Sequence, residues 1–148
     1  MLRRIVSALA GVLIAGLIAG PAFAEPVNTT FFGTALKGYD TVAYHAVGRT
    51  VEGSRRFSYT WRGATWRFAS AENRDLFAAD PERYAPAYGG YCAYGMTQGA
   101  KVDIDPTAWR IVDGRLYLNA NRDVQRIWVQ DIPGYIARAD THWQRITG

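Results

Sequence analysis

Two pairs of short alternating segments constrain the fold of this chain more than any other feature. Within each segment apolar and polar residues alternate, which indicates β-strands with one buried face. A glycine-containing break separates the members of each pair, as in a β-hairpin. In the first pair, Arg62-Gly63 lies between segments 57–61 and 65–69. In the second pair, Asp113-Gly114 lies between segments 109–112 and 115–118. The Asp-Gly pair suits a type I′ turn. The sequence therefore predicts two antiparallel hairpins.

Helical patterns follow both hairpins. Ser70 suits the N-cap of a helix that we expect to end before Asp80-Pro81, Asn121 suits the N-cap of another, and a further helix is expected after Pro133. Apolar residues at helical spacing predict the core-facing positions Leu76, Phe77, Val124, Ile127, Trp128, Tyr135, Ile136, Ala139 and Trp143. This order predicts a small single α+β domain, with antiparallel β-hairpins packed against three or four short helices.

The segment before the first hairpin is expected to contribute an arm and one more strand. We interpret residues 25–37 as an irregular N-terminal arm. The β-branched and aromatic run from Thr41 to His45 follows the turn-forming Gly38-Tyr39-Asp40 and predicts a first strand. The domain itself is therefore expected to span residues 38–148.

The first 24 residues have the three-part layout of a secretory signal peptide. Arg3 and Arg4 precede an apolar run that ends at Ala19, and Ala22-Phe23-Ala24 is a small-residue cleavage site. The apolar run is short for a bilayer span of roughly 20 residues. We therefore expect cleavage after Ala24, a periplasmic or secreted protein, and no membrane attachment after cleavage.

Charge and cysteine content limit the partners and the means of stabilisation. The chain carries 17 Lys and Arg against 13 Asp and Glu, and cleavage of the signal peptide would remove two arginines and no acidic residue. Because the remaining arginines are scattered, we expect no binding to nucleic acid. With one cysteine the exported domain forms no internal disulfide, so its core must stabilise it alone. Five tryptophans supply large apolar surfaces for that core.

The stretch between Tyr84 and Trp109 is rich in glycine and tyrosine and shows no strand pattern. A structureless stretch of this length indicates a site or a hidden element. A short helix that starts after Gly89-Gly90 and ends at Gly99 would place Cys92 in its first turn and Met96 four residues later on the same face. The hydroxyl groups of three tyrosines either line a ligand-binding pocket or pack in the core: Tyr88, Tyr91 and Tyr94.

Three interpretations of Cys92 are open. N–H groups at a helix start stabilise a thiolate, and a thiolate beside the thioether of Met96 is a soft ligand pair that selects an ion such as Cu(I). His45 is either a third ligand or a hydrogen-bonded structural residue. Alternatively, Cys92 is the nucleophile of a thiol-dependent redox protein or enzyme, or it packs as a small apolar side chain in a structural or interaction module without a ligand.

Established catalytic motifs do not occur in the sequence. It contains no glycine-rich phosphate loop, no Gly-x-Ser-x-Gly elbow, no His-Glu-x-x-His and no paired-cysteine zinc spacing. We therefore predict a binding protein and not an enzyme. The hypothesis for its ligand is a soft metal ion, copper-like, or a small molecule held near Cys92.

Four motifs together resemble the secreted or periplasmic branch of the YHS-domain family: Gly38–Tyr44, Trp66–Ser70 with Phe77, Asp80–Tyr84 and Tyr88–Ala93. The later hairpin, from Asp113 to Asn119, is similar to the C-terminal extension of that branch. The resemblance implies a YHS-like domain over residues 38–148 with a C-terminal hairpin and helices. It also implies a small metal-handling module related to treble-clef-like domains.

The chain departs from that family at the cysteine positions. Metal-binding relatives present Phe-Cys-Ser-x-x-Cys where this chain has Ala69 and Asn73 at the two cysteine positions. The early Asp-Pro-x-Cys of the family is Asp40-Thr41-Val42-Ala43 here. We therefore expect no thiolate-rich zinc or copper cage, and Cys92 is the candidate ligand for any metal function that is retained. The resemblance predicts the fold better than the function.

Overall fold

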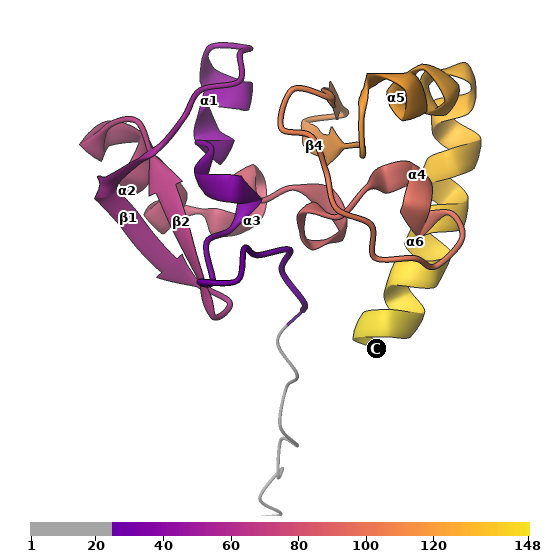
Figure 1. Cartoon of the computed structure of the whole chain (residues 1–148), viewed down its shortest axis with the longest axis horizontal. Helices are drawn as coiled ribbons and strands as arrows, with labels where there is room; N and C mark the ends of the chain where they lie inside the picture. Colours follow the sequence, from indigo (N-terminus) through magenta and orange to yellow (C-terminus); the bar gives the residue numbers. More distant parts are fainter. Residues whose placement is uncertain (1–24) are drawn as a thin grey trace, which may run out of the picture.

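The computed structural model describes residues 25–148, and the predicted signal peptide, residues 1–24, lies outside the described residues. Figure 1 shows two lobes that lie side by side. One lobe contains the first hairpin with α1, α2 and α3, and the other contains the second hairpin with α4, α5 and α6. The predicted α+β fold with two antiparallel hairpins is confirmed.

In the N-terminal lobe a hairpin packs against short helices. Its elements are the 3₁₀ turn η1 (Leu36–Gly38), α1 (Thr41–Ala46), β1 (Ser54–Trp61), β2 (Ala64–Phe68), α2 (Ala71–Ala79) and α3 (Pro81–Tyr84). Ser70 caps α2 as predicted, since its side chain accepts a hydrogen bond from the Asn73 N–H. The ring of Phe77 lies 5.1 Å from that of Trp66 and 5.1 Å from that of Phe68, which fixes α2 on the hairpin.

The predicted strand at Thr41–His45 is wrong, because this segment forms helix α1. The Asp40 side chain accepts hydrogen bonds from the N–H groups of Val42 at 2.9 Å and Ala43 at 3.1 Å. These bonds satisfy two of the N–H groups that a helix start leaves unpaired. This local capping outweighs the β-propensity of the β-branched and aromatic residues in the segment.

The C-terminal lobe combines a short hairpin with the longest helix. Its elements are the 3₁₀ turns η2 (Ala87–Gly90) and η3 (Val129–Asp131), with α4 (Ala93–Met96), β3 (Trp109–Val112), β4 (Arg115–Leu118), α5 (Arg122–Trp128) and α6 (Ile132–Thr147). Asp113 and Gly114 have φ values of 51° and 77°, as the predicted type I′ turn requires. The described chain has six α-helices, more than the three or four predicted.

Two of the predicted core positions are wrong. Phe77 and Trp128 are buried, but their neighbours Leu76 and Ile127 are 40% and 41% exposed. Adjacent residues on a helix point about 100° apart, so the aromatic ring fills the core and the preceding aliphatic side chain turns outward. Of the other predicted positions, Ala139 and Trp143 are buried, and three are partly buried against the core: Val124, Tyr135 and Ile136.

The N-terminal arm, predicted to be irregular, contacts both lobes. The Asn28 N–H donates to the Gly89 carbonyl in one lobe at 2.8 Å, and the Ala35 N–H donates to the Thr65 carbonyl in the other at 2.9 Å. Ala35 and Leu36 are buried in the core. The end of the arm is therefore part of the domain.

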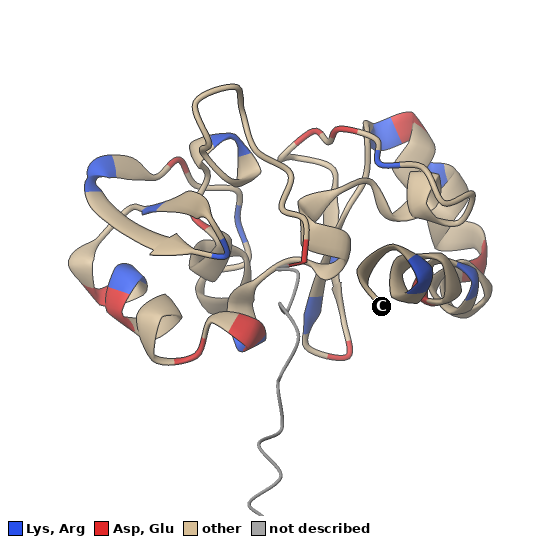
Figure 2. Ribbon diagram, turned by 90° about the horizontal axis from the view of Figure 1, so that it is seen from below, with Lys and Arg blue, Asp and Glu red and all other residues tan. Residues whose placement is uncertain are grey.

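Charges of both signs are distributed over both lobes (Figure 2). This agrees with the scattered arginines of the sequence. Within residues 25–148, no helix combines the length and the apolar character that a bilayer crossing needs.

Candidate functional site

Cys92 stands at the start of the short helix that the sequence predicts. That helix is α4, and Cys92 is its N-cap, one position before the first turn. The Met96 N–H donates to the Cys92 carbonyl at 2.9 Å, and the Cys92 N–H donates to the Val102 carbonyl at 2.8 Å. Gly99 follows the helix with a φ of 72°, the left-handed conformation that glycine adopts readily. Backbone hydrogen bonds on both sides thus hold the cysteine in place.

The sulfur of Cys92 is enclosed and hydrogen-bonded. Its residue is 1% exposed. Sγ accepts hydrogen bonds from the Gly95 N–H at 3.4 Å and the Ala120 N–H at 3.3 Å, and it donates to Asn119 Oδ1 at 3.5 Å. We call these four residues the Cys92 centre. The centre ties α4 to the residues that follow β4.

The Cys92 centre lies in a hydrophobic cluster that both lobes share. The N-terminal lobe contributes Leu36 and Tyr44, and the C-terminal lobe contributes Ile104, Leu116 and Leu118. Tyr44 is anchored by its hydroxyl group, which donates to the Pro106 carbonyl at 2.7 Å. Burial of Tyr44 raises its pKa above the ordinary range, so the hydroxyl remains a donor. The position of Cys92 at this junction gives the side chain a packing role between the lobes.

Asn119 is the residue of this centre that sequence reasoning missed. It is completely buried, and its Oδ1 accepts from the Tyr94 N–H at 3.1 Å as well as from the thiol. Its Nδ2 is buried and has no hydrogen-bond partner within the described part of the chain. A single asparagine after a strand carries no distinctive pattern, so the sequence offers no signal for this role.

The three predicted metal ligands lie in different surroundings. Met96 is buried in the cluster of Trp128, Ala139 and Trp143, which is separate from the cluster that contains Cys92. His45 lies on α1, where its ring packs edge-on against Tyr84 at 5.5 Å. Among residues 25–148, no three His, Cys, Asp or Glu side chains are grouped so that they would hold a metal ion.

His45 is partly buried in surroundings that disfavour its protonated form. Burial and the nearby Arg83 lower the pKa of His45, and a backbone hydrogen bond at Tyr84 opposes them. Its Nε2 is buried without a hydrogen-bond partner in the described chain. The neutral ring is therefore the form that this site favours.

The three predicted ligand-binding tyrosines lie in or against the hydrophobic cluster that contains Ala139 and Trp143 of α6. Tyr88 is buried, and its hydroxyl group donates to Asp140 Oδ1 on that helix at 2.9 Å. Burial, followed by the neighbouring Asp140, raises the pKa of Tyr88 above the ordinary range. Tyr91 and Tyr94 pack against the same cluster, and Tyr94 contacts the ring of Tyr135 edge-on at 5.4 Å.

A second buried polar group lies in the N-terminal lobe. Asp40 is completely buried, and each of its two carboxylate oxygens accepts two hydrogen bonds. Oδ1 binds the N–H groups of Val42 and Ala43 in α1. Oδ2 binds the Ala69 N–H at 2.8 Å and the Asn73 side-chain amide at 2.8 Å. We call this arrangement the Asp40 corner, because it joins α1, the end of β2 and the start of α2.

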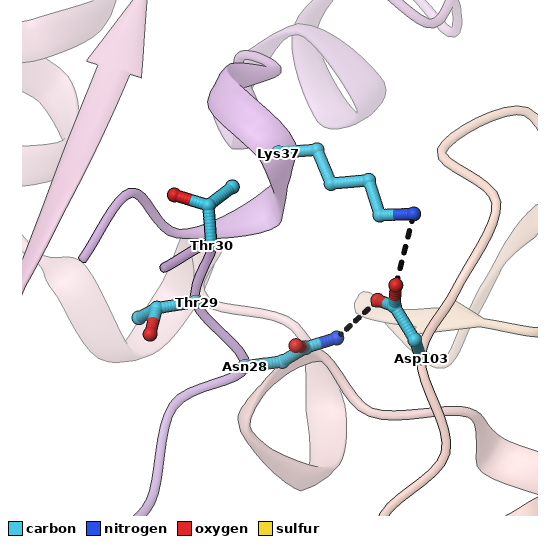
Figure 3. Close-up of a pocket in the computed structure, with 5 residues that line it drawn as sticks. All are labelled: Asn28, Thr29, Thr30, Lys37 and Asp103. Atoms are coloured by element: carbon cyan, nitrogen blue, oxygen red, sulfur yellow. Dashed lines mark hydrogen bonds and ion pairs between the residues drawn. The ribbon is translucent and has the colours of Figure 1, made fainter. Parts of the chain in front are cut away.

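A small polar cavity of about 80 Å³ lies between the arm and the loop before β3. Figure 3 shows Lys37 and Asn28 pointing toward Asp103, which binds Lys37 Nζ at 3.0 Å and the Asn28 amide at 3.0 Å. Partial burial acts to raise the pKa of Asp103, but the hydrogen bonds from Asn28, the Ile104 N–H and Lys37 outweigh it and lower the pKa. The charges in this cavity are thus paired with each other.

Comparison with known proteins found no match: no protein-family model, no curated protein and no solved structure matches the chain.

Proposed function

We propose that the chain is an exported, non-catalytic binding module of the YHS type, in which hydrogen bonds to Asp40 replace the thiolate cage of the metal-binding relatives. The observation that carries the proposal is the Asp40 corner. Three positions where the family pattern has cysteines meet at this one carboxylate: Ala43, Ala69 and Asn73. This convergence on one carboxylate supports the proposal, although the side chains at these positions are not metal ligands.

The corner itself has no capacity left for a cation. A carboxylate offers about four lone-pair sites, and four N–H donors occupy those of Asp40. Hydrogen bonds to a carboxylate are about twice as strong as neutral ones, so these four bonds hold the corner together without a metal. In this proposal the corner stabilises the fold, and binding takes place on the molecular surface.

A cysteine-restoration experiment tests the proposal. The variant Ala43→Cys/Ala69→Cys/Asn73→Cys is titrated with Co²⁺ under reducing conditions and compared with the wild type. The matched control carries Ala46→Cys/Glu72→Cys/Asp75→Cys, three exposed positions on the same two helices. We expect the visible absorption of thiolate-bound Co²⁺ in the first variant alone, because only its three positions contact one common carboxylate.

Two results would contradict the proposal. The first is a restored variant that keeps the circular dichroism spectrum of the wild type and gives no thiolate-bound Co²⁺ absorption. The second is stoichiometric metal in the natively purified wild type that is lost in Asp40→Asn. If the restored variant does not fold, the pairwise variant Ala69→Cys/Asn73→Cys gives the same readout with fewer changes.

A second candidate function is a soft metal ion or thiol chemistry at Cys92. The favouring observation is that two backbone N–H groups, from Gly95 and Ala120, donate to its sulfur. An incoming ion would have to open the enclosing cluster and displace Asn119. Titration with Cu(I) against a competing chelator tests this candidate: tighter binding by the wild type than by Cys92→Ser supports it, and equal affinity ends it.

A further inference from the structure

Two phenylalanines of the N-terminal arm are almost entirely exposed. Phe31 is 96% exposed and Phe32 is 89% exposed, whereas the next large apolar side chain of the described chain, Val47, is 54% exposed. The two rings contact each other edge-to-face, with centroids 5.2 Å apart. Adjacent exposed aromatic rings present a large apolar surface to water, which is characteristic of a surface that a partner covers.

The turn that presents these rings is held in one conformation by its own hydrogen bonds. The Thr30 N–H donates to the Thr34 carbonyl at 2.9 Å, and the Gly33 N–H donates back to the Thr30 carbonyl at 2.9 Å. The Thr34 N–H also donates to Thr30 Oγ1 at 3.2 Å. We call residues 29–35 the aromatic tip. Because its backbone is already paired, the tip needs little ordering when it binds.

The aromatic tip is fixed to the body of the molecule at its base. The Thr65 N–H in β2 donates to the Gly33 carbonyl at 2.9 Å, and the Ala35 N–H donates to the Thr65 carbonyl. Figure 2 shows the uncharged stretch between Glu25 and Lys37 as a loop that projects from between the two lobes. The rings are thus held at a fixed position away from the surrounding surface.

The charges around the tip indicate what kind of surface it fits. Residues 26–36 contain no charged side chain. At the flanks, Lys37 is paired with Asp103 at 3.0 Å, and Arg62 is paired with Glu25 and Glu82 at 2.6 Å each. These two cations are therefore already neutralised. A third, the half-buried Arg67, donates to Thr34 Oγ1 within the tip at 3.2 Å. The cations beside the tip are thus engaged by groups of the chain itself, and an anionic surface would find little to attract it. The complementary surface is uncharged and apolar.

A lipid membrane and a second copy of the chain fit the aromatic tip less well than another protein does. Anionic membranes attract clusters of unpaired Lys and Arg. Even one myristoyl chain gives only marginal, reversible membrane binding, and stable anchoring takes a second signal such as a polybasic patch, which residues 26–36 do not supply. In a second copy, the cavity beside the tip is lined by polar side chains and its volume is about 80 Å³, so it does not accept two phenylalanine rings.

We propose that the aromatic tip inserts Phe31 and Phe32 into an uncharged, apolar pocket on another protein. The two rings are the anchors of this contact, and the exposed threonines at positions 29 and 30 precede them in the tip as its polar edge. This inference rests on the proposed function only in that the chain acts by binding. The two experiments fail independently. If no partner is found for the aromatic tip, the Co²⁺ titration of the cysteine variants is unaffected. If that titration fails, the contact made by Phe31 and Phe32 is unaffected.

The test begins with a photo-cross-linking amino acid, p-benzoylphenylalanine, placed at position 31 or 32 of the full chain in the cells that produce it. Position 47 is the matched control, since Val47 is the next most exposed large apolar residue. We expect one protein adduct of defined mass from positions 31 and 32 and none from position 47. We also expect the adduct from position 31 to disappear when Phe32→Ser is added.

The second step measures affinity with the adduct protein, identified by mass spectrometry and purified. We expect Phe31→Ser/Phe32→Ser to weaken its binding by at least about tenfold, and Val47→Ser to leave it unchanged. The midpoint of thermal unfolding should be equal in all three proteins, because the two rings contact solvent and each other. Equal affinity of both variants, no adduct beyond that of position 47, or an adduct only to lipid or to a second copy would overturn the proposal.

Discussion

Asp40 and Cys92 are both buried N-cap residues of short helices, and the two sites differ in how completely they are hydrogen-bonded. Asp40 in the N-terminal lobe receives four N–H donors at 2.8 to 3.1 Å. Cys92 at the junction of the lobes makes three longer contacts at 3.3 to 3.5 Å, and Nδ2 of the neighbouring Asn119 has no hydrogen-bond partner among residues 25–148. An ionised oxygen is a strong acceptor and sulfur is a weak one.

The difference indicates which site determines the fold. The four bonds of Asp40 connect residues up to 33 positions apart, so they assemble α1, β2 and α2 around one point. The bonds of Cys92 connect α4 to the end of β4, but apolar neighbours surround the sulfur and contribute much of the packing. We therefore expect the N-terminal lobe to depend on its polar side chain much more than the junction depends on its thiol.

The largest effect is expected for Asp40→Ala. The substitution leaves the buried N–H donors of the Asp40 corner without an acceptor, and each unsatisfied buried donor costs about 1 to 3 kcal/mol. We expect the free energy of unfolding to fall by about 4 kcal/mol, measured by urea denaturation. Asp40→Asn retains one oxygen and should lose less. A loss below about 1 kcal/mol for Asp40→Ala would break the comparison.

A smaller effect is expected for Cys92→Ala. The loss of a buried thiol and its weak hydrogen bonds should lower the free energy of unfolding by about 1 to 3 kcal/mol. The same denaturation experiment measures it, with Val47→Ala as an exposed control. The comparison between the two sites would be reversed if Cys92→Ala destabilised the protein more than Asp40→Ala.

The smallest effect is expected from His45, which borders the N-terminal lobe core. Burial and Arg83 lower the pKa of His45 in the folded state, so the unfolded chain binds a proton more readily. Stability should therefore be full above the unfolded pKa of about 6.5 and should decline as the pH falls below it. We expect this decline to be shallower in His45→Phe than in the wild type when unfolding is measured from pH 7 to pH 5. Parallel curves would show that His45 carries no such linkage.

Local patterns in the sequence predicted the elements whose causes are local. The Asp113-Gly114 turn and the caps at Ser70 and Asn121 were predicted correctly, because each depends on residues within four positions along the chain. Helix α1 was predicted as a strand because Thr41–His45 is rich in β-branched and aromatic residues, and the N-cap hydrogen bonds of Asp40 override that propensity. Propensity and capping are of similar magnitude, so the sequence alone does not decide between them.

The polar sites depend on contacts that no local pattern records. Asn73 reaches Asp40 across 33 positions, and Asn119 reaches Cys92 across 27. The enclosure of Cys92 follows from the packing of both lobes around it, which periodicity does not reveal. The exposure of Phe31 and Phe32 was also unpredictable, because apolar residues in a sequence ordinarily indicate burial.

The reaction rate of Cys92 with a thiol reagent tests most directly the claim that its sulfur is structural and that binding takes place elsewhere. The rate is measured with dithionitrobenzoate in the folded protein and in the protein unfolded by urea. If the thiol becomes accessible only when the junction opens, the folded protein should react at least about a hundred times more slowly. A folded protein that reacts as fast as the unfolded chain, or faster, would contradict the account, because the sulfur would then be presented for chemistry.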